Sequence, residues 1–293
     1  MPASAAFTRL AFSGPILPDY AELETTRRVP RWRWFASLFI IGFYPAFLSL
    51  LGQWMTWRHK RSAGNPALPS TPRGLVLYVA LDLAVFFALW GVAWLFSRAT
   101  KDELLLRWRG GLWRPIWQGL AWSVGIRLAL GVGVMILAMI AVMALAAAGH
   151  DPKSLEHLLR ANSPKTDTLF APSALANPLY LFLVVTLLSF VAAGVREELW
   201  RTGCLAALRH LLPAHWSENA VWGASIALSS VIFGLGHIYQ GGLGVVLTGV
   251  IGAGLGLLTW RNRSIWPSVW AHGFFDATSF LLAAAVAMKK IAV

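Results

Sequence analysis

The chain has 293 residues, of which 57% are hydrophobic and 13% are charged, and its mean hydropathy is +0.60. Soluble globular domains carry about 25% charged residues, so this composition excludes an ordinary soluble domain and favours a membrane protein. The net charge of +12 does not indicate a nucleic-acid partner, because the basic residues form short clusters beside apolar runs and face anionic lipid there. The single cysteine, Cys204, excludes a disulfide within the chain and a cysteine-based zinc site.

Residues 1–32 are polar and rich in proline. Their longest apolar stretch, Leu10–Leu17, is interrupted by Gly14 and Pro15, and no small-residue cleavage site follows it. We therefore expect a tail rather than a signal peptide. Residues 33–293 contain no polar block long enough for a soluble domain, so we expect them to form one membrane domain.

Seven apolar segments follow in chain order, and each is long enough to cross a bilayer as a helix. They cover residues 34–56, 74–97, 116–148, 178–212, 219–240, 242–260 and 265–288. Residues 98–115 are basic and amphipathic and are expected to lie along the membrane surface. The predicted fold is all-α, a polytopic transmembrane bundle of about seven to eight helices, because an eighth helix would fit within 98–115 or 150–176.

The basic clusters predict a topology. The N-terminal tail, the 98–115 cluster and the turn at Arg261 and Arg263 can face the cytoplasm together, as the positive-inside rule requires. This arrangement leaves some basic residues on the other side: Arg58, Lys60, Arg61, Lys289 and Lys290.

Small and charged residues within the spans predict helix contacts. Gly252 and Gly256 have the small-xxx-small spacing of a helix that packs closely on its neighbours. Asp82 and Arg127 lie inside spans and are expected to pair across helices. Arg196 is expected to snorkel, or to balance the acids that follow it.

An acid pair, Glu197 and Glu198, follows the uncharged run 179–195 and stands between Arg196 and Arg201. Ionised side chains inside a bilayer cost about 3 kcal/mol each even on insertion scales, so those that remain usually have a function. The acid pair is therefore the first candidate for a functional site.

Two histidines occur later in the chain in comparable settings. His237 follows Phe233 by four residues, and Asp276 follows His272 by four, so each pair shares one helix face. Helix rises place Glu197 about 22 Å and His237 about 30 Å from the 212–217 turn, and His272 about 12 Å from the turn before its helix. These depths coincide if the hairpin that carries Glu197 and His237 projects past the membrane surface. We therefore expect the acids and both histidines to converge.

These motifs, taken in order, resemble those of a known family. An acid pair followed by arginine, then Phe-x-x-x-His, then His-x-x-x-Asn or Asp, is similar to the CPBP family. Its members are intramembrane proteases related to type II CAAX prenyl endopeptidases and to bacteriocin-processing or immunity proteins. The resemblance covers residues 178–280, and the ordered triple is more specific than any one motif.

The resemblance implies a role for each residue. Glu197 and His237 would activate a water, and His272 and Asp276 would stabilise the tetrahedral oxyanion. Glu198 would complete the catalytic set, with Arg201 and Phe233 in support. Peptide hydrolysis does need a base for water, donors for the developing oxyanion and a site with little bulk water.

The position of the arginine departs from the family's pattern, in which the spacing is commonly Glu-Glu-x-x-x-Arg. Here Thr202 occupies the arginine position and Arg201 comes one residue earlier. On a helix Arg201 then pairs with Glu197 at i+4, or it reaches Glu198 at i+3. We retain Glu197 as the predicted base.

Asp276 is the second departure, because asparagine is common at this position. An ionised aspartate cannot donate to an oxyanion, but it can hold His272 as an imidazolium that donates. Alternatively, Asp276 helps to bind a metal with Glu197, His237 and His272, since these are acceptable ligands for zinc and an open zinc site generates hydroxide. Because no His-Glu-x-x-His is present, we favour metal-free activation and keep a divalent metal as the alternative.

The sequence therefore predicts an intramembrane endopeptidase that acts on a membrane-associated or lipidated peptide or protein. We expect it in a lipid bilayer, the bacterial plasma membrane, with the site opening to the cytoplasm and no nucleic-acid partner. The shifted arginine and Asp276 favour one alternative, a catalytically silent binding or immunity protein. A proton-coupled transporter is the other, because buried Glu and His also form proton relays, although transporters usually show repeats and broken helices.

Overall fold

A computed structural model of the protein describes residues 29–58, 68–149 and 169–291. Within these ranges the structure is helical and contains no strand. Its elements are α2 (Arg31–Arg58), α3 (Pro72–Ser97), α4 (Arg114–Ala147), α6 (Pro172–Leu175), α7 (Pro178–Leu183), η1 (Val184–Glu197), α8 (Glu198–Leu211), α9 (Glu218–Gly236), η2 (Ile238–Gln240), α10 (Gly242–Asn262) and α11 (Trp266–Ile291). The chain divides into two units, Met1–Pro30 and Arg31–Val293, and every one of these elements belongs to the second.

In the described part, 6 helices are long and apolar enough to cross a membrane. They are α3, α4, the continuous helix Pro178–Leu211 formed by α7, η1 and α8, then α9, α10 and α11 as far as Met288. The predicted all-α, polytopic membrane fold is confirmed. The predicted segments agree with the helices to within a few residues, except at the C-terminal end of α9. Helix α2 also forms where an apolar segment was predicted, but it is not among the six.

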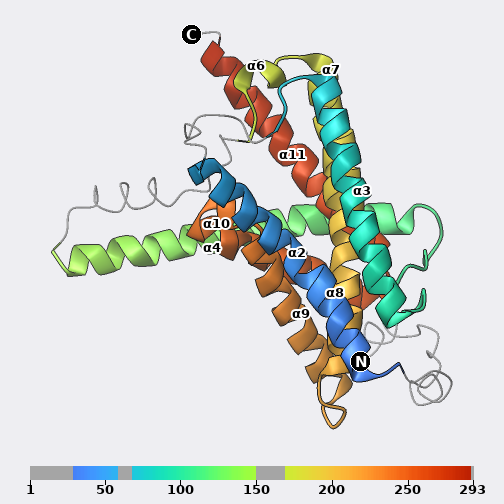
Figure 1. The fold of residues 1–293 in the computed structure, drawn as a ribbon. Coiled ribbons are helices and arrows are strands. Elements are labelled where there is room, and N and C mark those ends of the chain that lie inside the picture. The colour runs from blue at the N-terminus through green and yellow to red at the C-terminus, as the bar shows by residue number, and fades with distance from the viewer. Residues whose placement is uncertain (1–28, 59–67, 150–168, 292–293) are drawn as a thin grey trace, which may run out of the picture. The chain divides into compact units, whose positions relative to one another are not determined.

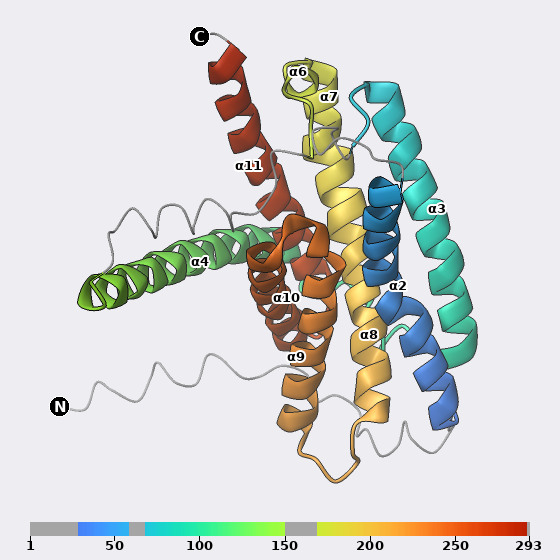
Figure 2. The same ribbon diagram turned by 60° about the vertical axis from the view of Figure 1, so that its left-hand side comes forward.

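Helices distant in sequence lie side by side. Helix α2 packs against α3, α8 and α9, α9 packs against α10, and α11 packs against both η1 and α4. In both views α4 crosses the other helices steeply, and its second half extends away from them (Figures 1 and 2). Its buried residues are Pro115, Gly119 and Ser123, all in its first third. The N-terminal part of α4 is therefore its most closely packed part, and Arg127, just beyond it, still contacts α11.

Several connections meet at one end of the bundle, where α2 begins and α8 ends (Figure 1). Arg31 donates to the carbonyl of Leu211, and Arg263 pairs with Glu218. The backbone amide of Ile265 donates to Leu105 at 3.0 Å. The 98–113 link and the turn at Arg263 therefore share an end, as the predicted topology requires, while the N-terminal tail lies outside the described residues.

The 98–113 link, which we expected to lie along the membrane surface, does not form the additional helix that would fit there. It consists of turns, with positive φ at Arg98 and Leu105, and Leu104 and Leu105 are buried. Its carbonyls accept hydrogen bonds from the helices, as that of Leu104 does from the Thr202 hydroxyl at 2.6 Å. The carbonyls of Leu104 and Leu105 accept hydrogen bonds from other parts of the bundle, so their backbone does not need the hydrogen bonds of a helix of its own. The two leucine side chains can therefore insert into the bundle.

The link is also held by Glu103, which contacts the end of α8. Its carboxylate accepts from His210 Nε2 at 2.9 Å and from the amide of Thr100 at 2.6 Å. Burial raises the pKa of the Glu103 carboxyl, but these hydrogen bonds outweigh burial and hold the pKa below its ordinary value. The contact therefore stabilises the link fully above the ordinary carboxyl pKa, and this stabilisation is lost as the pH falls through the lowered pKa.

The predicted segment 219–240 contains two elements. Helix α9 ends at Gly236, His237 caps it, and η2 follows. Gly241 then takes φ of 85°, a left-handed conformation that glycine adopts at no steric cost, and α10 begins at the next residue. His237 therefore lies at a helix end and not within a helix as predicted.

The glycines of α10 allow close packing, as predicted. A Cβ on Gly252 would lie 3.0 Å from the Phe233 ring and 3.2 Å from Arg201 Nη1, and one on Gly256 would lie 3.0 Å from Ile226. Both glycines therefore face α9, and Gly252 also faces the arginine that follows the acid pair.

Candidate active site

The acid pair lies where η1 meets α8 in the continuous helix Pro178–Leu211. The segment η1 has the π-helical pattern over 14 residues, a form that is rare and often found at functional sites. Small residues line its contact with α11, since a Cβ on Gly194 would lie 2.9 Å from the carbonyl of Val269. The close approach brings α11, with His272, against the acid pair.

Glu198 is the buried member of the pair, with 1% of its surface exposed. Its Oε2 accepts from Arg201 Nε at 3.0 Å, and its Oε1 accepts from His272 Nδ1 at 3.0 Å. Both carboxylate oxygens are therefore engaged by cationic or donor groups, as a buried charge requires.

Arg201 takes the i+3 arrangement and pairs with Glu198, so the i+4 pairing with Glu197 does not form. It is fully buried, and its Nη1 donates to the carbonyl of Gly252 at 3.1 Å. Its guanidinium carbon lies 4.4 Å from the centre of the Phe233 ring. Arg201 thus joins α8 to α9 and α10, directly behind the acid pair.

His272 faces three carboxylates. Its Nδ1 donates to Glu198, and its Nε2 lies 3.7 Å from Glu197 Oε2 and 3.9 Å from Asp276 Oδ2. Because Nδ1 faces an acceptor, it carries a proton, and Nε2 is directed between Glu197 and Asp276. His272 is 5% exposed, so this ring is fixed in orientation.

Glu197 is less enclosed than Glu198, since 16% of its side chain is exposed. Its Oε1 accepts from Arg196 Nη2 at 2.6 Å. Its Oε2 lies beyond hydrogen-bond distance from His272 Nε2. Glu197 therefore has an oxygen available to a water or a substrate, whereas both oxygens of Glu198 are occupied.

His237 reaches the site through Phe233. Its Nδ1 donates to the Phe233 carbonyl at 2.9 Å, which leaves Nε2 as the basic nitrogen. The Phe233 ring centre lies 4.9 Å from that of His237 and 6.1 Å from that of His272. The predicted residues are therefore brought together, with Phe233 between the two histidines.

Residues 178–278 match the family model described as type II CAAX prenyl endopeptidase Rce1-like. This stretch is similar to the Rce1-like domain. The resemblance predicted from the motifs is confirmed, and the match supports a protease activity in an integral membrane protein. No curated protein and no solved structure gives a significant match to the chain.

The acidic and histidine side chains of residues 178–278 do not form a metal site. Glu198 is committed to Arg201 and His272, and His237 has one nitrogen on a carbonyl. Across residues 29–58, 68–149 and 169–291, no three His, Cys, Asp or Glu side chains converge as metal ligands. This arrangement does not fit a three-ligand metal site.

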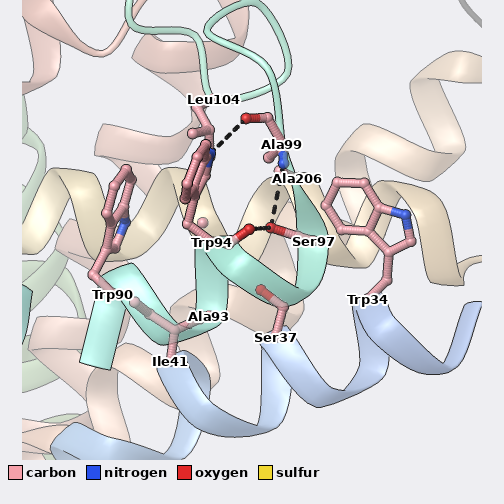
Figure 3. Close-up of a pocket in the computed structure, with 11 residues that line it drawn as sticks. Trp34, Ser37, Ile41, Trp90, Ala93, Trp94, Ser97, Ala99, Leu104 and Ala206 are labelled. Atoms are coloured by element: carbon pink, nitrogen blue, oxygen red, sulfur yellow. Dashed lines mark hydrogen bonds between the residues drawn. The ribbon is translucent and has the colours of Figure 1, made fainter. Parts of the chain in front are cut away.

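A small pocket lies elsewhere, between α2, α3 and the 98–113 link (Figure 3). Three indoles line it, those of Trp34, Trp90 and Trp94, and Ala206 closes it from α8. None of its lining residues is titratable. It offers the hydroxyls of Ser37 and Ser97 but no acid or base to activate them, so the acid cluster within residues 178–278 is the candidate reaction site.

The prediction that Asp82 pairs with Arg127 is wrong. Asp82 pairs with Arg196 at 3.2 Å. Arg127 donates to the hydroxyls of Thr278 and Ser279, at 2.6 Å and 3.1 Å. The sequence did indicate that Asp82 has a cationic partner, because a lone aspartate in an apolar span needs a cation. Sequence reasoning could not choose among the intramembrane arginines.

Gly252 and Gly256 allow a matched test of the site's packing. An alanine at either position must displace side chains of α9, which we expect to lower the free energy of unfolding by about 1–3 kcal/mol in both cases. Only Gly252→Ala also pushes on Phe233 and Arg201, so it alone should lower kcat, by about tenfold. Unfolding in detergent and cleavage of one peptide measure the two effects. Equal activity losses in both variants would contradict this account.

Proposed function

We propose that the protein is an intramembrane endopeptidase that hydrolyses a peptide bond of a membrane-associated or lipidated substrate. The observation that carries the proposal is the difference between the contacts of the two glutamates. Glu198 is saturated by Arg201 and His272, while Glu197 keeps an oxygen beside His272 Nε2. One acid thus orients the histidine, and the other is free to act as a base.

In the proposed reaction Glu197 accepts a proton from a water that His237 Nε2 also holds. The water oxygen attacks the amide carbon, and the carbonyl oxygen becomes an oxyanion. His272 Nε2–H donates to that oxyanion as an imidazolium, a form that the surrounding carboxylates of Glu197, Glu198 and Asp276 stabilise. Glu197 then returns its proton to the amide nitrogen, the carbon–nitrogen bond breaks, and a carboxylic acid and an amine leave.

We also propose the bacterial plasma membrane as the location, with the site reached from the cytoplasm. The basic 98–113 link and the Arg263 turn share one end of the bundle, and the positive-inside rule assigns such an end to the cytoplasm. Glu197 lies 14 residues before Leu211 at this end, about 21 Å along the helix.

Cleavage of a peptide library by purified protein tests the proposal, with and without a strong chelator. We expect cleavage that the chelator leaves unchanged, and we expect His237→Ala to remove it while the protein stays folded in detergent, because the water loses one of its two acceptors. Cleavage that stops with the chelator and returns with zinc would contradict the metal-free route. Binding without turnover would indicate a silent member of the family.

A further inference from the structure

Arg196 lies at the centre of a polar network that the proposed reaction does not use directly. Its Nη2 donates to Glu197 Oε1 at 2.6 Å. On its other side Nε lies 3.2 Å from Asp82 Oδ2, and Nη1 donates to the Tyr44 hydroxyl at 3.1 Å and to Asp82 Oδ1 at 3.3 Å. Its Nε also donates to the carbonyl of Ala192 at 2.8 Å. Every guanidinium nitrogen therefore has an acceptor, and the group is fixed on all sides.

Two of these partners come from outside the matched region 178–278. Tyr44 belongs to α2 and Asp82 to α3, and both helices pack against the continuous helix that carries the acid pair. The Arg196 and Asp82 side chains are 18% and 21% exposed. Such a pair is shielded enough from solvent to hold its geometry, unlike an exposed surface pair.

Glu197 depends on this network for its orientation. Its Oε1 is held by Arg196, whereas its Oε2 has His272 at 3.7 Å, too far for a hydrogen bond. Arginine has many rotamers, so Arg196 alone would not fix the carboxylate. Asp82 binds the opposite edge of the Arg196 guanidinium and keeps it from rotating fully toward Glu197.

We infer that Asp82 and Tyr44 are positioning residues that act through Arg196 to hold the Glu197 carboxylate in its working orientation. The inference rests on the proposed function, because it assigns these residues to the same reaction. It extends the site to helices α2 and α3. If the role is merely structural, the Asp82–Arg196 pair holds two helices together and its loss affects stability without a specific effect on kcat.

Peptide cleavage by Asp82→Asn separates these two roles. We expect kcat to fall about 10- to 100-fold, since a misplacement of about 1 Å costs that much, while KM stays within about twofold because no substrate contact is removed. Asp82→Glu should recover most of the kcat, as it keeps the charge. Tyr44→Phe should lower kcat by a few-fold, since it removes one acceptor and no charge. Glu218→Gln, which breaks the remote pair with Arg263, is the matched control and should leave kcat unchanged.

The double variant Asp82→Asn, Arg196→Gln makes the test specific. If Asp82 acts only through Arg196, the double variant has the same kcat as Arg196→Gln alone, whereas independent roles multiply the two losses. Multiplied losses, or a folded Asp82→Asn variant with normal kcat, would overturn the inference and leave the proposed function intact. If Asp82→Asn does not fold, an unchanged kcat in Tyr44→Phe overturns it. A wild-type protein that cleaves no peptide removes the proposed function and the inference together.

Discussion

Glu197→Gln is expected to lower kcat by about 10³- to 10⁴-fold, the upper part of the range for loss of a general base. Glutamine has the same shape and still accepts from Arg196, but it takes no proton from water. The side chain is partly exposed, at 16%, so the free energy of unfolding should change by less than about 1 kcal/mol. Cleavage of one peptide by wild-type and variant protein, with unfolding measured in the same detergent, checks both statements.

The matched control for Glu197→Gln is Glu218→Gln. Glu218 is also a glutamate paired with an arginine, but its side chain is 54% exposed and lies at the far end of α9. It should therefore keep full activity. If Glu197→Gln retained wild-type kcat, or if Glu218→Gln lost as much, the base would be a different group.

Arg201→Met is expected to give the largest loss of stability. It leaves the Glu198 carboxylate buried beside His272 with no arginine partner, and removal of one member of a buried ion pair costs about 3–5 kcal/mol. Activity should be lost as well, because His272 is held by Glu198. Chemical unfolding in detergent measures the first effect and peptide cleavage the second.

Two variants isolate the cause of this loss. Arg263→Met breaks a partly exposed pair, in which the arginine is 22% and the glutamate 54% exposed, and should cost no more than about 1 kcal/mol. Adding Glu198→Leu to Arg201→Met removes the unpaired charge, so stability should return while activity does not. A stability loss in Arg201→Met as small as that in Arg263→Met would show that the buried pair is not the central support of the site.

Much of the fold was predictable because apolar runs alone locate spanning helices. The segments 74–97 and 116–148 agree closely with α3 and α4. The end of α9 was not predictable in this way, since Ile238 and Tyr239 continue the apolar pattern. Local backbone decides it, because Gly241 takes a positive φ and begins the reversal into α10.

The convergence of the acids with His272 was predictable from helix rise, because depth along a helix follows from residue count. The choice of neighbours around the helix axis was not. Depth alone allowed Arg201 to reach either glutamate, and it allowed Asp82 to reach more than one arginine. The junction between η1 and α8 sets the actual directions at Glu197 and Glu198, and no sequence pattern marked that junction.

Cleavage in water labelled with a heavy oxygen isotope tests the central claim most directly, because Glu197 is proposed to activate the water whose oxygen enters the product. Purified wild-type protein should release a peptide whose new carboxyl group contains one heavy oxygen atom, at a rate that Glu218→Gln matches, while Glu197→Gln releases none above background. Equal heavy-oxygen incorporation by Glu197→Gln and wild type would contradict the account.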